Sequence, residues 1–87
     1  MKLVNIGYGN LVAQGRIVSI IAPEAAPIKR IISDAKGAGH LIDASCGRAT
    51  ASVIVCDNGM IILSAATPQT LRGRIESDEK GEDVGEL

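Results

Sequence analysis

The sequence predicts a small α/β fold of the α+β type, with one mostly antiparallel sheet of about five short strands, one main helix and a short C-terminal helix. Short runs rich in β-branched residues recur along the chain, as strands require. Two of them, residues 53–56 and 60–63, flank Asp-Asn-Gly at residues 57–59. Asn-Gly is the usual pair for a tight hairpin turn, because both central positions need a positive φ. Residues 28–35 instead repeat their apolar side chains at helical spacing.

Three further strands are predicted before this hairpin. Residues 3–6 form the first, and residues 7–10 follow it as a tight turn in which two glycines allow unusual backbone angles. Residues 16–21 form the second, and Arg16 lies at its start, where the side chain can reach solvent. Residues 41–44 form the third, and a loop that contains Arg48 then leads into the hairpin.

Two helices complete the prediction. The main helix should begin at Pro27, because proline is tolerated at the first helical position and breaks a hydrogen bond further inside. Gly37 or Gly39 should end it in a left-handed conformation. Its apolar face is formed by four residues at i, i+3, i+4 and i+7: Ile28, Ile31, Ile32 and Ala35. The last helix should run from Thr67, as the N-terminal cap, to about residue 75.

The hairpin predicts self-association. Both of its strands are apolar on both faces, so both faces must be covered, and the main helix can cover only one of them. The core is small and aliphatic, with no Phe or Trp. Cores of this size usually need a metal, disulfides or oligomerisation, and two cysteines, Cys46 and Cys56, are too few for a zinc site. We therefore expect another copy of the chain to cover the bare face.

Charge divides the chain into two parts. Residues 1–75 carry eight Lys or Arg against four acidic residues, whereas residues 76–87 carry six acidic residues and one lysine. This predicts a basic folded domain over residues 1–75 and an acidic, disordered tail over residues 76–87. No apolar run approaches the length of a membrane span, and the start of the chain has no long apolar segment. We expect a cytoplasmic protein with no membrane partner, whose two thiols are packing residues.

The residues that carry catalytic chemistry are sparse. His40 is the single histidine, and the carboxylates of the folded part are scattered along the chain. No acid and base pair can be argued from them, and Asp57 is explained by the turn beside it. The sequence therefore predicts a protein that is not an enzyme, with no cofactor, no metal site and no small-molecule substrate.

The basic residues are the better candidates for a functional site. Arg16 and Arg48 would share one edge of the sheet if their strands lie together, and the arginine fork suits phosphate. The alternative is that each is an ordinary solubilising charge or pairs with Asp43 or Asp34. Lys29 and Arg30 lie near a helix N-terminus, where exposed backbone N–H groups favour an anion.

The composition also indicates which nucleic acid such a surface would suit. Proteins that bind RNA or single strands usually stack bases on aromatic rings, and Tyr8 is the only aromatic residue. Basic residues without aromatics fit the backbone of duplex DNA better. A few contacts in one subunit bind weakly, and repetition around a closed oligomer multiplies them.

Five segments resemble the RemA family of bacterial regulatory proteins in order and spacing, from about residue 3 to residue 75. They are Asn5-Ile6-Gly7-Tyr8-Gly9-Asn10, Ala26-Pro27-Ile28-Lys29-Arg30-Ile31-Ile32, Leu41-Ile42-Asp43-Ala44, Gly47-Arg48 and Ile61-Ile62-Leu63-Ser64. The resemblance implies a cytoplasmic DNA-binding transcriptional regulator that controls extracellular-matrix genes. It also implies a ring-shaped homo-oligomer with DNA along the ring, and it places the DNA contacts at Arg16 and Arg48.

A second interpretation stays open. The chain has Ala49 where the family commonly has a second arginine, and Ala51 where another basic residue is frequent. The alternative to a DNA-binding regulator is therefore a structural, oligomeric protein-interaction module without DNA binding.

Overall fold

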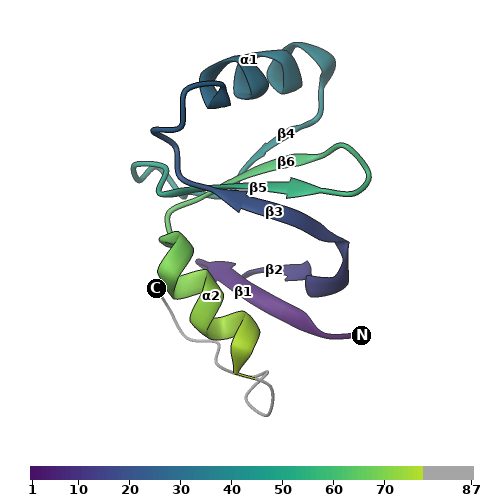
Figure 1. The fold of residues 1–87 in the computed structure, drawn as a ribbon, viewed down its shortest axis with the longest axis vertical. Coiled ribbons are helices and arrows are strands. Elements are labelled where there is room, and N and C mark those ends of the chain that lie inside the picture. The colour runs from purple at the N-terminus through teal and green to yellow at the C-terminus, as the bar shows by residue number, and fades with distance from the viewer. Residues whose placement is uncertain (78–87) are drawn as a thin grey trace.

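Four strands form the larger sheet, in the order β3-β5-β6-β4 (Figure 1). The computed structural model describes residues 1–77. The strands are β3 (Ile17–Ile21), β4 (Leu41–Asp43), β5 (Ser52–Cys56) and β6 (Ile61–Ser64). β5 is antiparallel to both β3 and β6, whereas β4 is parallel to β6. β3 and β4 are therefore the edge strands of this sheet.

A separate two-stranded sheet lies across one side of the larger one. It pairs β1 (Leu3–Gly7) with β2 (Asn10–Ala13), and a short 3-10 helix, η1 (Gln14–Arg16), leads from β2 into β3. The helices are α1 (Ile28–Ala38) and α2 (Pro68–Glu76). The predicted α+β class with a mostly antiparallel arrangement is confirmed, although residues 1–77 contain six strands in two sheets.

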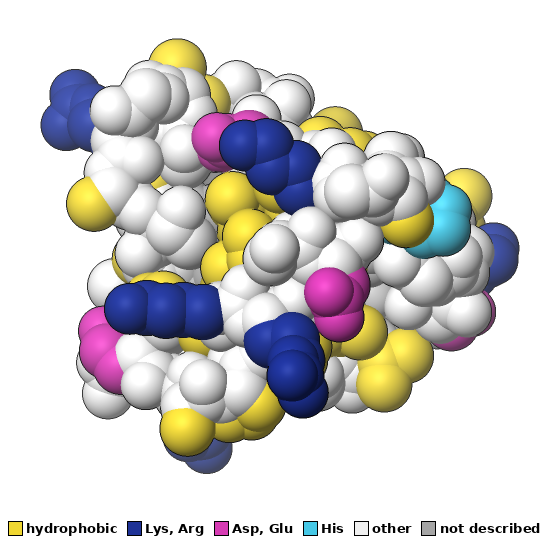
Figure 2. All heavy atoms as spheres, turned by 90° about the horizontal axis from the view of Figure 1, so that it is seen from above, with side chains coloured by type: hydrophobic (Ala, Val, Ile, Leu, Met, Phe, Trp, Pro, Cys, Tyr) yellow, Lys and Arg dark blue, Asp and Glu magenta, His cyan; other side chains and the backbone are white. Residues whose placement is uncertain are grey.

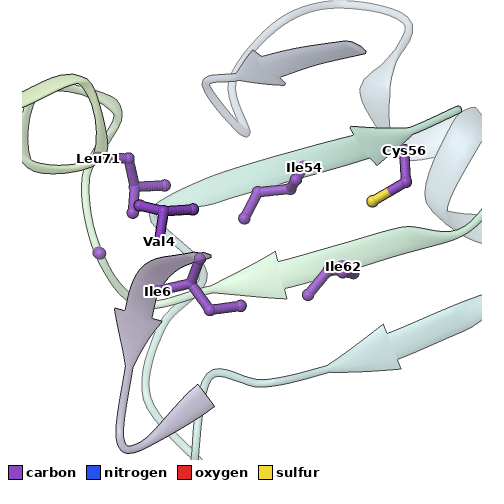
Figure 3. Close-up of a cluster of buried hydrophobic side chains, with 7 residues drawn as sticks. Val4, Ile6, Ile54, Cys56, Ile62 and Leu71 are labelled. Atoms are coloured by element: carbon purple, nitrogen blue, oxygen red, sulfur yellow. The ribbon is translucent and has the colours of Figure 1, made fainter. Parts of the chain in front are cut away.

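The central hairpin is covered on both faces within one protomer. Neighbouring residues of a strand point to opposite faces, and the core divides in the same way. On one face, Ile54, Cys56 and Ile62 pack with β1 and α2 (Figure 3). On the other face, Val53 and Ile61 pack with α1. The prediction of a bare face that needs another copy is wrong, because β1, β2 and α2 together supply the second layer (Figure 1).

The turn of that hairpin differs from the predicted one. Gly59 has a φ of 89°, but Asn58 is not among the residues with positive φ. The N–H of Gly59 donates to the Cys56 carbonyl at 3.1 Å, and the Met60 N–H donates to the Asn58 side chain at 3.1 Å. The loop therefore has three residues, with a tight turn followed by a left-handed glycine. Asn58 acts through its side chain rather than through a left-handed backbone.

A second hairpin, absent from the prediction, joins β1 to β2. Gly7 pairs with Asn10, so Tyr8 and Gly9 alone form the loop. Their φ values are 56° and 80°, as a type I′ turn requires. The predicted tight turn is confirmed. The strand that follows it escaped prediction because Asn10–Ala13 is short and lacks a run of β-branched residues.

The helix boundaries follow the predicted signals closely. Pro27 lies immediately before α1, and Gly39, with a φ of 78°, ends it in the left-handed region. Gly37 remains inside the helix, so Gly39 is the terminator. The Thr67 side chain accepts a hydrogen bond from the Thr70 N–H at 3.1 Å and caps α2 as predicted. The predicted tail, residues 76–87, lies outside the described residues except for Glu76 and Ser77.

The two cysteines have different surroundings. Cys56 is buried in the core, as predicted for a packing residue, and this burial raises the pKa of its thiol. The neighbouring Asp57 raises the pKa further, while Arg16 lowers it. Cys46 is exposed, so the packing role predicted for it is wrong. Both are free thiols.

Candidate nucleic-acid interface

Arg48 is presented by a tight turn in the loop between β4 and β5. Its backbone N–H donates to the Ser45 carbonyl at 3.0 Å, which closes a four-residue turn. The two central residues, Cys46 and Gly47, have φ values of 57° and 79°. A left-handed cysteine is uncommon and costs conformational energy, so the surrounding structure must hold it in place. The Arg48 side chain is exposed and has no hydrogen-bond partner among residues 1–77.

Asp43 fixes the start of this loop. One oxygen of its carboxylate accepts hydrogen bonds from the Ser45 hydroxyl at 2.6 Å and from the Ser45 N–H at 3.0 Å. The side-chain hydrogen bond is the larger cause, and the backbone one the smaller, of a lowered pKa at Asp43. The carboxylate is thus engaged with Ser45 and does not pair with Arg48. At the other end of the loop, the Ala51 N–H donates to the Ser64 carbonyl at 2.8 Å.

The start of α1 lies at the same end of the sheet as Arg48. Two consecutive turns follow β3, in which the Ala25 N–H donates to Ala22 and the Ile28 N–H donates to Ala25. They bring Lys29 and Arg30 out at this end, and both side chains are exposed. The first turn of α1 has no acidic residue and no side-chain cap. Its N–H groups and the two cations therefore favour an anion.

Arg16 lies at the opposite end, on the last residue of η1. Its Nε donates to both carboxylate oxygens of Asp57 at 2.9 Å, and the Asp57 N–H donates to the Arg16 carbonyl at 2.9 Å. The ion pair is solvent-exposed, since 62% and 44% of the two side chains are accessible. The acidic partner of Arg16 is therefore Asp57, not Asp43 or Asp34, the two candidates from the sequence. Asp57 thus forms an ion pair in addition to its place in the hairpin turn.

Strand pairing separates the two arginines. β3 pairs with β5 so that Ile17 faces Cys56 and Ile21 faces Val53. Arg16 precedes Ile17, whereas Arg48 precedes β5, beside the far end of β3. At about 3.3 Å per residue, the five-residue β5 places these ends roughly 15 Å apart. The expectation that Arg16 and Arg48 share one edge within a protomer is therefore wrong. Arg48 shares its end with Lys29 and Arg30 instead.

Figure 2 shows that the cations on the face seen there are spread apart, and that acidic side chains lie beside several of them. The other two arginines, Arg72 and Arg74, belong to α2. Arg72 pairs with Glu76 at 3.0 Å across one helical turn, on the solvent side. Arg74 Nη1 donates to the Asn5 carbonyl at 2.9 Å and ties α2 to β1. These two residues are engaged in the fold of the protomer.

Other kinds of site find little support among the described residues. His40 is exposed, and its backbone joins α1 to β6 through hydrogen bonds to Ala35 and Ile61 at 2.8 and 2.9 Å. Within residues 1–77, no group of three or more His, Cys, Asp or Glu side chains is placed to hold a metal ion. No helix in that part of the chain is long and apolar enough to cross a bilayer.

Comparison with known proteins places the chain in a family of regulatory proteins. Residues 3–75 match the family described as "RemA-like: Extracellular matrix regulatory protein A-like". A "Putative regulatory protein" of Dictyoglomus thermophilum is 57% identical, over 95% of this chain and 98% of its own length. One from Synechococcus sp. is 55% identical, over 92% of this chain and 90% of its own. The protein therefore belongs to the RemA-like family, and the resemblance stated from its sequence is confirmed.

Proposed function

We propose that this protein is a DNA-binding transcriptional regulator that acts as a homo-oligomer, in the control of extracellular-matrix genes. The observation that carries the proposal is the Arg48 turn. The Arg48 guanidinium is exposed and has no partner among residues 1–77. Its left-handed turn is held by hydrogen bonds, and it lies at the same end of the sheet as Lys29 and Arg30. The family's description supports the regulatory role and the matrix genes.

Arg48 would supply the principal contact. Its planar fork donates two parallel hydrogen bonds to a phosphate or to a guanine edge, and the fixed turn reduces the conformational entropy lost on binding. Lys29 and Arg30 would contact neighbouring phosphates, together with the N–H groups of the first turn of α1. In this proposal the protein uses no catalysis and no cofactor.

Arg16 would contribute less than Arg48. The Asp57 carboxylate neutralises its charge and occupies its Nε, so the terminal nitrogens of the guanidinium are the donors that remain for a phosphate. A duplex that approaches Arg16 also meets the negative charge of Asp57. Arg16 and Arg48 lie at opposite ends of one protomer. If both contact the same short stretch of duplex, they must therefore come from neighbouring protomers.

Assembly would raise the affinity, since a few phosphate contacts per subunit are multiplied when the DNA follows a ring of subunits. The free edge of β3 is a candidate surface for this assembly. Val18, on the free edge of β3, is 65% exposed. Edge strands of monomeric proteins usually carry charges or prolines that block pairing, and a branched apolar residue there favours contact with another copy.

Mobility shift of a duplex at several salt concentrations tests the proposal. We expect Arg48→Ala to weaken binding about tenfold or more, and Arg16→Ala to weaken it less. The matched control is Arg72→Ala, which removes an exposed arginine from α2 and should leave affinity unchanged. Affinity of the wild type should fall steeply as salt rises. Equal binding by wild type and Arg48→Ala would remove this residue from the site.

The alternative is an oligomeric protein-interaction module, and one observation favours it. An open groove of about 370 Å³ lies between β3 and α2, with apolar lining from Ile17, Val18 and Ile20. A peptide could bind there by its apolar side chains. Absence of any salt-dependent shift with duplex DNA, at protein concentrations where the oligomer is intact, would favour this second function.

A further inference from the structure

The tip of the β1–β2 hairpin holds a strained residue. Tyr8 has a φ of 56°, in the left-handed region, where Asn or Gly would adopt the same turn at a lower cost. Residues held in such conformations persist only when their surroundings fix them, and they cluster at binding sites. The position therefore has a requirement other than the geometry of the turn.

Hydrogen bonds on the flanking residues fix this tip. The Gly7 N–H donates to the Asn5 side chain at 2.8 Å, inside the buried part of the strand. The Asn10 side chain donates back to the Gly7 carbonyl at 3.0 Å. Below them, the buried Ser64 hydroxyl donates to the Ile6 carbonyl at 2.8 Å. The tip is thus attached to the core of the larger sheet.

The ring of Tyr8 has no role in the described core. The residue is 40% exposed, and it belongs to neither cluster of buried side chains nor to the side chains packed against them. It is also the only aromatic residue of the whole sequence. The hairpin therefore holds the single ring of the protein at its surface, in a backbone conformation that disfavours it.

The turn between β1 and β2, which holds Tyr8, and the loop between β4 and β5, which holds Arg48, lie at the same end of the molecule. Both β1 and β3 run toward that end (Figure 1). Ser64 joins the two segments. Its hydroxyl donates to the carbonyl of Ile6, two residues before Tyr8, and its carbonyl accepts from Ala51, three residues after Arg48. Ser64 therefore links the strand that leads into the Tyr8 turn to the residue that ends the Arg48 loop.

We propose that Tyr8 is a further DNA-contacting residue, which packs its ring against a deoxyribose and donates its hydroxyl to a phosphate beside the one that Arg48 binds. This inference rests on the proposed function. Tyrosine hydroxyls are among the groups that position proteins on the phosphate backbone. A rigid ring with two rotatable bonds supplies contact area at a low cost in conformational entropy.

Charge favours DNA over an uncharged partner at this end. Lys29, Arg30 and Arg48 all emerge there, while the Asp43 carboxylate is engaged by Ser45. Glu24 is the other acidic residue there, in the connection before α1. An anionic partner that meets these cations would also meet the ring of Tyr8.

Tyr8→Asn tests the inference without endangering the fold, because asparagine suits a left-handed turn. We expect its melting temperature to equal or exceed that of the wild type, while its affinity for duplex DNA falls about tenfold. Because a neutral hydroxyl releases no counterion, the slope of log affinity against log salt should stay unchanged. Arg48→Ala should instead lower that slope by about one for each phosphate that the arginine neutralises in the wild type.

Two further variants sharpen the test. Tyr8→Phe keeps the ring and removes the hydroxyl, so its affinity should lie between those of Tyr8→Asn and the wild type. The matched control is Leu3→Asn, at the opposite end of the same hairpin, where an apolar residue is 43% exposed. We expect this variant to bind DNA as the wild type does.

The outcomes separate the two proposals. If Tyr8→Asn binds as the wild type does while Arg48→Ala loses affinity, the role of Tyr8 is overturned and the proposed function stands. If Tyr8→Asn changes the mass of the protein in solution, Tyr8 contacts another copy instead of DNA, and the inference is again overturned. If the wild type itself gives no salt-dependent shift, the proposed function fails and this inference fails with it.

Discussion

Ser64 shows how much of the candidate interface depends on one small polar side chain. It is fully buried at the end of β6, and its hydroxyl donates to Ile6 and accepts from the Ala66 N–H at 3.0 Å. The sequence around it is a short apolar run, and nothing in that run predicts a junction between distant segments. Such a contact depends on the tertiary arrangement, so sequence patterns predicted the strand and missed the function of its last residue.

Cys56 gives a prediction at this scale. Burial holds the pKa of its thiol above the ordinary value of 9.0, so the folded protein keeps this proton when the unfolded chain has lost it. Below about pH 9 both states are protonated and the free energy of unfolding is unaffected by this group. As the pH rises above that value, the free energy of unfolding should decrease, which chemical denaturation at several pH values can measure.

The matched pair of variants isolates that effect. Cys56→Val removes the titrating thiol and should flatten the decrease above pH 9, whereas Cys46→Ser changes an exposed thiol and should leave it in place. An identical alkaline decrease in both variants would show that other groups cause it.

At the scale of the element, local signals predicted most of the fold. Pro27, Gly39 and Thr67 each mark a helix end by a mechanism that acts within a few residues. Residue type departs from local preference at two turns, because Tyr8 and Cys46 occupy left-handed positions that favour Asn or Gly. Both turns lie at the candidate DNA-binding end, and such departures from local preference are expected where a site imposes its own requirement.

Two glycines at the C-terminal end of α1, one inside the helix and one just after it, provide a prediction at this scale. Gly37 lies inside the helix with open space around it, so Gly37→Ala should raise the free energy of unfolding by about 0.5–1 kcal/mol. Gly39 has equal space but a φ of 78°, so Gly39→Ala should lower it by about 1–2 kcal/mol. Urea denaturation of both variants measures the difference. Stabilisation by both substitutions would contradict the left-handed end of α1.

At the scale of the whole molecule, two predictions from the sequence were wrong for the same reason. They were the bare face of the hairpin and the shared edge of Arg16 and Arg48. The two-stranded sheet folds over the larger one, and β4 runs parallel to β6, so the ends at which Arg16 and Arg48 emerge are set by the topology. No local pattern fixes which face a distant hairpin covers, or which end of a strand a loop reaches. The basic residues were therefore identified from the sequence, and their grouping was not.

The assembly prediction belongs to this scale. Val18→Lys places a charge on the free edge of β3, where burial against another copy would be costly, so the mass in solution should decrease. Light scattering or sedimentation measures this with and without duplex DNA. The control is Ala38→Lys, at the exposed end of α1, which adds the same charge and should not change the mass. A monomeric wild type at micromolar concentration would refute assembly altogether.

The two layers that cover the central hairpin have a consequence for the lifetime of such a complex. Because each protomer buries its own hairpin on both sides, a subunit that dissociates stays folded and exposes no unpaired core. In the proposed oligomer, subunits would then exchange between complexes on dilution without unfolding. Mixing two populations labelled with different fluorophores should therefore produce energy transfer at a rate set by dissociation, far faster than global unfolding.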